Sequence, residues 1–357
     1  MRTIDLRSDT VTLPTVEMLE AMRSAELGDD VYGEDPTVNR LEELAAEKMG
    51  KEAALLTTSG TQANLVSVLS QTKRGDEVIL EPESHMYYYE VGALSVVGGL
   101  FPRLVKGDMG VIAPTDVEEA LRPTDIHFPP TSLVCIENTH SRAGGAMWTP
   151  SQTKAVYDVT KRRGLNLHLD GARIFNAAVA QNLDPRDFTR HADSLMFCLS
   201  KGLSAPIGSV AVGDYDFIVS ARKYRKMLGG GMRQAGIVAA AGIIAIETMV
   251  QRLRDDHANA KMLAGGLERL GVPVNPSNVH TNILVYDVSA LGVTPETWIS
   301  RMGNYGIKLG AVDNARVRMV THRGVEKKDI EYVLDAAAKV IDKSRTGSER
   351  RAIQENL

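Results

Sequence analysis

The sequence has few of the residues that mark secreted, membrane-spanning or metal-binding proteins. Its 357 residues include only two cysteines, Cys135 and Cys198, and both lie inside apolar runs. Buried free thiols are therefore expected in place of a disulfide or a metal site. This sparse use of cysteine is typical of a reducing compartment. We predict a cytoplasmic protein.

Long hydrophobic runs and a strong net charge are also missing. The longest apolar run, residues 235–246, is rich in alanine and glycine and ends at Glu247, which predicts a buried helix and not a membrane span. The first residues are charged, so we expect no signal peptide. The formal net charge of −4 gives no electrostatic reason to expect nucleic acid. No set of histidine, cysteine and carboxylate residues has zinc-site spacing.

Short apolar runs alternate with segments of helical spacing along most of the chain. Strands are predicted at 53–57, 77–80, 133–137, 165–169 and 195–199. Helices are predicted at 15–24, 62–70, 87–97, 151–163 and 234–252, and another begins near residue 36. This alternation predicts an α/β fold, with a mostly parallel sheet and helices on both faces.

The pattern changes near residue 251, and the length exceeds what one simple core needs. We predict an N-terminal arm at 1–35 and a large domain at 36–250. A small α+β domain is predicted at 251–345, with helices at 255–270, 296–305 and 328–341 and strands at 282–286 and 316–320. The last residues, 346–357, are predicted to form a polar, frayed tail.

Two polar residues follow neighbouring predicted strands. Asp170 comes directly after the run 165–169, and Lys201 follows the run 195–199. Because side chains at the carboxyl ends of parallel strands converge on one crevice, we expect the two to meet. This pair fits pyridoxal phosphate, since the lysine forms a Schiff base with its aldehyde and the carboxylate keeps its ring nitrogen protonated. The ordinary alternatives are a solvated lysine and an aspartate that starts a turn.

The segment Thr58-Ser59-Gly60-Thr61-Gln62 connects a predicted strand to a predicted helix. Small residues let backbone amides approach an anion, and the helix N-terminus adds its positive end, so we predict a phosphate cradle. A simple capped helix start is the alternative. Neither Gly-x-Gly-x-x-Gly nor a Walker lysine is present, which argues against a dinucleotide or ATP site.

Four basic residues are candidates for binding anions. Arg173 and Arg318 could each grip a substrate carboxylate through two hydrogen bonds, or could simply be solvated. Lys226 and Arg233 flank a triple glycine and could bind phosphate across a subunit interface, although charges at helix ends would look the same.

Two histidines, His85 and His127, are candidates for proton transfer, since imidazole titrates near neutral pH and can stack on a planar ring. A lone histidine is more often a structural hydrogen-bonding group. Here His168 lies two residues before Asp170, on the same face of its strand, and is expected to support it.

Several longer strings carry a resemblance to a known family over residues 3–340. They are Ile4-Asp5-Leu6-Arg7-Ser8-Asp9-Thr10-Val11-Thr12, Gly28-Asp29-Asp30-Val31-Tyr32-Gly33-Glu34-Asp35-Pro36, Ser59-Gly60-Thr61-Gln62-Ala63-Asn64, Glu137-Asn138-Thr139-His140, His168-Leu169-Asp170-Gly171-Ala172-Arg173, Leu199-Ser200-Lys201-Gly202 and Lys226-Met227-Leu228-Gly229-Gly230-Gly231-Met232-Arg233-Gln234. With these strings the chain closely resembles the low-specificity L-threonine aldolases, which are fold-type-I pyridoxal-phosphate enzymes of the β-eliminating lyase superfamily.

The resemblance implies a fold and an activity. The fold would be transferase-like, with a mostly parallel seven-stranded sheet and a smaller C-terminal α+β domain. The activity would be reversible retro-aldol cleavage of L-threonine, L-allo-threonine and related β-hydroxy-α-amino acids to glycine and an aldehyde. The family is typically a homotetramer built from two tight dimers, with no nucleic-acid or membrane partner.

The resemblance also implies roles for individual residues. Lys201 would carry the cofactor, Asp170 would pair with its ring nitrogen, and His85 would stack on the ring. The remaining roles are phosphate binding by Gly60 and Thr61, substrate-carboxylate binding by Ser8, Arg173 and Arg318, a place near the substrate hydroxyl for His85 and His127, a lining of the site from a neighbouring subunit by Lys226 and Arg233, and a structural cation near Thr10 and Thr12.

The chain departs from the family in two places. Where members usually carry asparagine and a glycine-rich turn, this chain has Ser141-Arg142-Ala143-Gly144-Gly145. Three tyrosines, Tyr87-Tyr88-Tyr89, follow His85, and this aromatic wall could favour larger aldehydes or simply pack a helix. Other reactions on the same cofactor stay open at this point, among them β-elimination, phenylserine cleavage and hydroxymethyl transfer, as does a non-catalytic protein that binds the cofactor.

Overall fold

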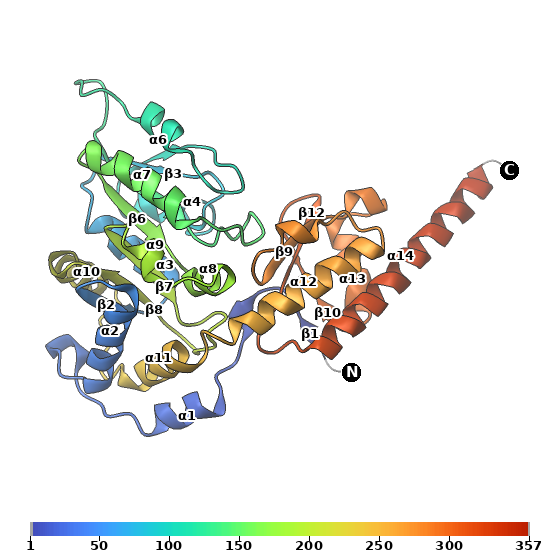
Figure 1. Ribbon diagram of the computed structural model, residues 1–357, viewed down its shortest axis with the longest axis horizontal. Coiled ribbons are helices and arrows are strands. Elements are labelled where there is room, and N and C mark those ends of the chain that lie inside the picture. Colours follow the sequence, from blue (N-terminus) through green and yellow to red (C-terminus); the bar gives the residue numbers. More distant parts are fainter. Residues whose placement is uncertain (1–2, 356–357) are drawn as a thin grey trace. The chain divides into compact units, whose positions relative to one another are not determined.

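The computed structural model describes residues 3–355, with side chains described as far as Asp342. The chain divides into two compact units (Figure 1). The larger unit is Leu13–Gln251, and the smaller unit combines Met1–Thr12 with Arg252–Leu357. The first residues group with the smaller unit because the strand β1 (Ile4–Asp5) pairs with β10 (Ile307–Lys308).

A seven-stranded sheet forms the centre of the larger unit. Its strands are β2 (Ala53–Thr57), β3 (Glu77–Leu80), β4 (Phe101–Leu104), β5 (Thr131–Glu137), β6 (Asn166–Asp170), β7 (Ser194–Cys198) and β8 (Ser209–Gly213). They lie in the order β2-β8-β7-β6-β5-β3-β4. Neighbours from β7 to β4 are parallel, whereas β8 is antiparallel to both β2 and β7. The predicted mostly parallel seven-stranded sheet is confirmed.

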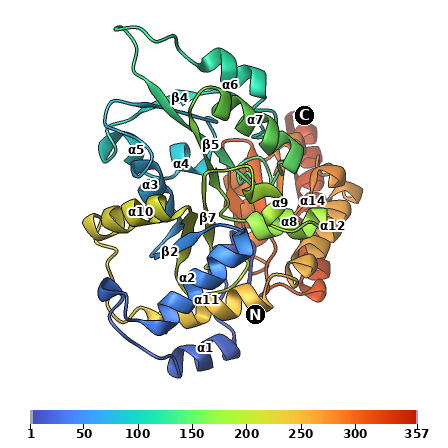
Figure 2. The same cartoon turned by 60° about the vertical axis from the view of Figure 1, so that its left-hand side comes forward.

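Helices cover both faces of this sheet, as predicted. They are α1 (Val16–Arg23), α2 (Pro36–Met49), α3 (Gly60–Leu69), α4 (His85–Tyr88), α5 (Ala93–Val96), α6 (Pro114–Ala120), α7 (Pro150–Arg162), α8 (Ile174–Gln181), α9 (Arg186–Thr189), α10 (Tyr215–Met227) and α11 (Gly236–Thr248). Figure 2 shows α3 and α10 on one side of the sheet and α7 and α9 on the other.

Local sequence signals explain where the well-predicted helices begin. The side chain of Asp35 accepts a hydrogen bond from the backbone N–H of Val38, and Pro36 occupies the first turn of α2. Thr149 and Gln152 cap α7 reciprocally, each side chain bonding to the other's backbone. Such caps satisfy N–H groups that have no partner inside the helix.

The predicted helix at 87–97 is wrong. The structure has two short helices, α4 and α5, with a break between them. Val91 and Gly92 have φ angles of 57° and 68°, which a right-handed helix cannot contain. Glu90 is only 3% exposed and turns inward to bond His85. The hydrogen bond between Glu90 and His85 favours this break over the continuous helix that the apolar spacing predicts.

The smaller unit contains the strands β9 (Ile283–Asp287), β11 (Gly310–Ala311) and β12 (Arg316–Val320) in an antiparallel sheet, and the helices α12 (Leu253–Arg269), α13 (Pro295–Gly303) and α14 (Lys327–Glu355). In its core the indole N–H of Trp298 donates to the hydroxyl of Tyr286 over 3.0 Å. α14 is longer than predicted, and the side chains of the expected polar tail at 346–357 lie outside the described residues.

The apolar run at 235–246 forms α11, which buries Ala239, Ala240 and Ala241 as predicted. Between residues 3 and 355, no single helix is both long enough and apolar enough to cross a membrane.

Candidate active site

Three neighbouring strands bring their carboxyl ends to the same edge of the sheet. The register of β5, β6 and β7 places Asp170 beside Glu137 on one side and Met196 on the other. Cys198 ends β7, and Lys201 follows three residues later. The two strands that lead to Asp170 and Lys201 are therefore neighbours in the sheet, and Asp170 is only 2% exposed there.

Asp170 is held by hydrogen bonds to both carboxylate oxygens. Oδ1 accepts from the backbone N–H of Ala172 over 3.0 Å, and Oδ2 accepts from the side-chain amide of Asn64, on α3, over 2.9 Å. Two donors on a buried carboxylate compensate for its removal from water and fix its orientation.

A chain of hydrogen bonds behind Asp170 fixes the direction of each donor. The amide nitrogen of Gln71 donates to Ser194 over 2.7 Å, so the Ser194 hydroxyl can donate to Nδ1 of His168 over 2.8 Å. Nε2 of His168 then donates to the amide oxygen of Asn64 over 3.1 Å. Burial lowers the pKa of His168 to about 4, so its ring is neutral at pH 7. The amide nitrogen of Asn64 is thereby left to face Asp170.

His85 lies against the same group of side chains. Its Nδ1 is 2.9 Å from Oε1 of Glu90, and Asn64 donates to that same oxygen over 2.9 Å. Burial on its own would lower the pKa of His85, but the hydrogen bond to Glu90 and the charge of Asp170 outweigh it and raise the pKa. The charge of Lys201 opposes this rise, because the amine lies close enough to act on the ring.

His85, Glu90 and Asp170 offer ligand atoms that all lie within 4.8 Å of one another, which is a spacing that a metal ion could bridge. However, Asn64 points its N–H groups at both carboxylates. A cation shared by the two carboxylates would have to displace that amide. The arrangement therefore fits an imidazole and an organic cation better than a metal ion.

The predicted phosphate cradle lies at the start of α3. The hydroxyl of Ser59 accepts from the N–H of Gln62 over 3.2 Å, which leaves the N–H groups of Gly60 and Thr61 without a helical acceptor. A Cβ atom on Gly60 would lie 3.1 Å from Sγ of Cys198, so the backbone approaches the end of β7 closely. Gly60 thus places these amides next to the strand that leads to Lys201.

The triple glycine packs beside this cradle. A Cβ atom on Gly230 would meet the side-chain amide of Gln62 at 2.3 Å, and one on Gly231 would meet the stem of Lys226 at 2.6 Å. Gly230 therefore lies directly against the side chain of a residue in the first turn of α3. Arg233 is mostly exposed and pairs with Asp29 over 2.9 Å.

The remaining candidates differ in their exposure and in their place in the chain. Arg173 is buried and directly precedes α8. His127 is 76% exposed and pairs with Asp125, and it bonds no member of the group around Asp170. The last four candidates belong to the smaller unit and are Ser8, Thr10, Thr12 and Arg318. Arg318 donates to the carbonyl of Arg7, Ser8 accepts from the N–H of Thr10, and Thr12 donates to the carbonyl of Asp9.

Comparisons with known proteins place the chain in a family. Residues 5–290 match the family described as beta-eliminating lyase. The chain belongs to this family. It is 44% identical over 340 residues to low-specificity L-threonine aldolase 1 of Arabidopsis thaliana, covering 94% of this chain and 95% of the relative. It is also 44% identical over 333 residues to the low specificity L-threonine aldolase of Escherichia coli K12, covering 92% and 97%.

A solved structure supports the fold at lower sequence identity. A threonine aldolase from Leishmania major superposes with a TM-score of 0.81 at 21% identity, covering 95% of this chain and 99% of that one. The predicted resemblance, lyase family and fold class are confirmed.

Within this family, the departure at Arg142 has a structural explanation. Its guanidinium lies 3.9 Å from the ring centre of Tyr88, donates to the hydroxyl of Tyr89 over 2.9 Å and pairs with Glu83 over 3.0 Å. The ring of Tyr89 is in turn 5.5 Å from that of His85. The aromatic side chains therefore form a wall next to His85 that Arg142 holds in place.

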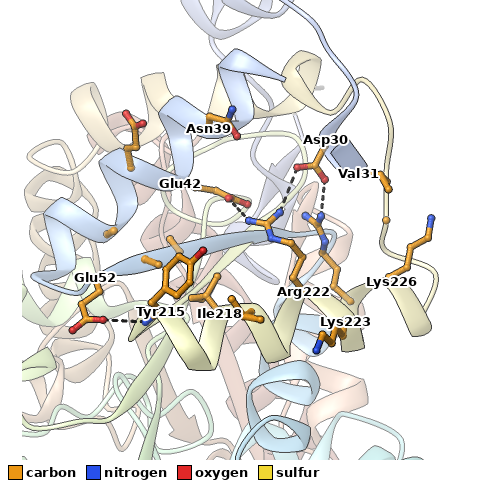
Figure 3. A pocket seen from close by; sticks show the side chains of 17 residues that line it. Asp30, Val31, Asn39, Glu42, Glu52, Tyr215, Ile218, Arg222, Lys223 and Lys226 are labelled. Carbon is orange, nitrogen blue, oxygen red and sulfur yellow. Dashed lines mark hydrogen bonds and ion pairs between the residues drawn. The ribbon is translucent and has the colours of Figure 1, made fainter. Parts of the chain in front are cut away.

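A separate open pocket of about 890 Å³ lies between α2 and α10 (Figure 3). Two ion pairs line it, each at 2.6 Å: Glu42 with the partly exposed Arg222, and Asp30 with Arg225, of which both partners are buried. Of the predicted site residues only Lys226 lies on its wall. The carboxylates and arginines here bind one another, so this pocket does not compete with the strand ends as the candidate active site.

Sequence reasoning missed Asn64 and Glu90. Asn64 stands in a quoted family string, but it looks like any polar helix residue. The partners of Asn64 in this group, Glu90 and Asp170, are 26 and 106 residues away along the chain. Glu90 lies inside the wrongly predicted helix at 87–97, so its inward turn was not expected.

Proposed function

We propose that this lyase-family member is a pyridoxal-phosphate-dependent aldolase that reversibly cleaves L-threonine, L-allo-threonine and related β-hydroxy-α-amino acids to glycine and an aldehyde. The observation that carries the proposal is the buried carboxylate of Asp170 at the strand end next to the one that leads to Lys201. The names and the 44% identity of the two relatives support the choice of reaction.

The residues present fit the cofactor. The amine of Lys201 matches the aldehyde of the cofactor, and the buried carboxylate of Asp170 matches its ring nitrogen. The start of α3, which Gly60 brings close to the sheet, matches its phosphate. When bound, the cofactor supplies a protonated ring that accepts the electrons released at the substrate Cα. Asp170 keeps the ring nitrogen protonated, and the N–H groups of Gly60 and Thr61 bind the phosphate.

The proposed roles of the other residues follow their chemistry. Lys201 binds the cofactor and exchanges a proton at the substrate Cα. His85 accepts the proton of the substrate hydroxyl, with His127 as the alternative group. Ser8, Arg173 and Arg318 bind the substrate carboxylate, because guanidinium groups hold carboxylates in a fixed orientation.

The reaction is tested by incubating the purified enzyme with L-threonine, L-allo-threonine and L-phenylserine and measuring both aldehyde and 2-oxo acid. We expect glycine and aldehyde in equal amounts from at least one substrate. Release of 2-oxo acid without aldehyde would indicate β-elimination and contradict the proposal. If no substrate reacts and no amino acid changes the absorbance of the cofactor, the protein is a non-catalytic binder.

We also propose a homotetramer assembled from two tight dimers, in which Lys226 and Arg233 reach the site of a neighbouring subunit. Large apolar side chains are exposed on and around α1, namely Leu13, Val16, Leu19, Leu27 and Tyr32. Exposed apolar patches of this kind mark protein interfaces. We further propose that a structural cation binds near Thr10 and Thr12, beside the buried Asp9. The two free, buried thiols support a cytoplasmic location for the protein.

The substitution Val16→Asp tests the assembly, because Val16 is 78% exposed in the single chain. A charge buried in a subunit interface is strongly unfavourable, so we expect sedimentation to show smaller species and activity to fall. The control is Glu20→Asp, on the same helix with its side chain 59% exposed. A Val16→Asp protein that sediments like the unsubstituted protein would place the interface elsewhere.

A further inference from the structure

Glu90 is a buried carboxylate that the proposed reaction has not yet used. It is 3% exposed, and its Oε1 receives two hydrogen bonds of 2.9 Å, one from Asn64 and one shared with Nδ1 of His85. Burial of a carboxylate is costly unless such donors compensate for it. Glu90 therefore carries a desolvation cost that its donors offset, and it lies directly beside His85, the candidate base.

The backbone around Glu90 carries a second cost. Val91 has a φ of 57°, in the left-handed region that β-branched residues rarely adopt. A residue in such a conformation is strained and persists only where surrounding contacts hold it. Here the strained valine directly follows Glu90 in the break between α4 and α5, where Glu90 turns inward.

The identity of the donors fixes the tautomer of His85. Oε1 of an ionised carboxylate only accepts, so the hydrogen on the bond to His85 must belong to Nδ1. The amide of Asn64 is not available to bond Nδ1 of His85 in place of Glu90. Its nitrogen donates to Glu90 and Asp170, and its oxygen accepts from His168. When the ring is neutral, its lone pair is therefore on Nε2.

We propose that Glu90 is a positioning residue for His85: its carboxylate holds a proton on Nδ1, so that Nε2 is the nitrogen that exchanges a proton with the substrate hydroxyl. This rests on the proposed function, in which His85 is the base. Asn64 supports both carboxylates at once, which ties the orientation of the base to that of Asp170, the partner of the cofactor.

Other charged groups around the pair are consistent with this role. Asp170 and Lys201 act on His85 with opposite signs, and Oε2 of Glu137 accepts the backbone N–H of His85 over 2.7 Å. Burial, together with the charge of Asp170, raises the pKa of Glu90 overall, and the hydrogen bonds from His85 and Asn64 oppose this rise by favouring the ionised carboxylate. The thiol of Cys135, whose pKa burial raises, contributes no charge.

The first test is the position of the ring proton in the holoenzyme with ¹⁵N-labelled histidine, measured by solid-state NMR. The signals of His85 are identified by their loss in His85→Asn. We expect protonated Nδ1 and unprotonated Nε2 at alkaline pH, where the ring is neutral. A proton on Nε2 in the unsubstituted enzyme would overturn the proposal without any variant of Glu90.

The second test is Glu90→Gln, which keeps the shape but replaces the anion by an amide that can donate to Nδ1. We expect kcat to fall about 10–100-fold, the range found when a carboxylate that orients a metal-binding histidine is removed. The limb of the pH profile that reports His85 should move to lower pH, because the anion that raised its pKa is gone. Glu43→Gln, whose side chain on α2 is 71% exposed, is the matched control.

A double variant separates positioning from a purely structural role. If Glu90 acts through His85, adding Glu90→Gln to His85→Asn should cause no further loss of activity. A further loss of the same size as in the single variant would overturn the proposal. If the unsubstituted enzyme releases no aldehyde, the proposed function fails, and the histidine spectra still decide the role of Glu90.

Discussion

Replacing Lys201 by alanine should remove nearly all activity and the visible absorbance of the lysine-bound cofactor. The amine is both the attachment point and the proton-transfer group, and loss of a proton-transfer group alone slows an enzyme by about 10²–10⁴-fold. The covalent attachment adds to that loss. Aldehyde release and the absorbance spectrum of the purified variant measure the two effects separately.

The matched control is Lys154→Ala. Lys154 is 55% exposed and pairs with Asp158 on the outer surface of α7, so its loss should leave turnover and absorbance unchanged. A Lys201→Ala enzyme with normal turnover would show that this lysine is not the attachment point of the cofactor and would contradict the proposed mechanism.

The second large effect is expected from Asp170→Asn. The substitution keeps the size of the side chain but removes the charge that holds a proton on the cofactor ring. Loss of one preorganised electrostatic contact at a reacting centre typically lowers kcat by about 10²–10³-fold. Because Lys201 is untouched, the variant should still bind the cofactor covalently, so activity falls while the lysine-linked absorbance persists.

This combination distinguishes Asp170 from Lys201, whose loss removes both signals. Asp158→Asn is the control, since that carboxylate is 45% exposed and bonds only Lys154. Turnover within a factor of about two of the unsubstituted enzyme for Asp170→Asn would mean that another group protonates the ring.

Local patterns predicted the elements that carry Lys201 and Asp170. After Ser194, the strand β7 is an apolar run buried on both faces, which is the pattern of a parallel strand in the middle of a sheet. In β6, leucines alternate with Asn166, His168 and Asp170, and the strand is still buried from Leu167 onward. The helix starts at Pro36 and Pro150 were found because their caps lie within three residues along the chain. Signals that are complete within one segment were read correctly.

The elements that were missed depend on distant partners. β4 includes Pro102 and lies at the edge of the sheet with its residues exposed or half-exposed, so its sequence carries no buried pattern. β8 has five residues and is held as a strand by antiparallel pairing with β2 and β7, which are far away in sequence. The break at Val91 has the same origin, since Glu90 turns inward to partners that no local pattern reveals.

The bond from Arg142 to the tyrosine wall has a consequence for how this protein can diversify. Arg142 contacts Tyr88, Tyr89 and Glu83, and Tyr89 in turn lies against His85. Because Arg142 is itself only 5% exposed, it anchors both rings from inside the protein. A single substitution at position 142 would therefore change the room beside His85 through two tyrosines at once, which makes this one codon a route to a new substrate range.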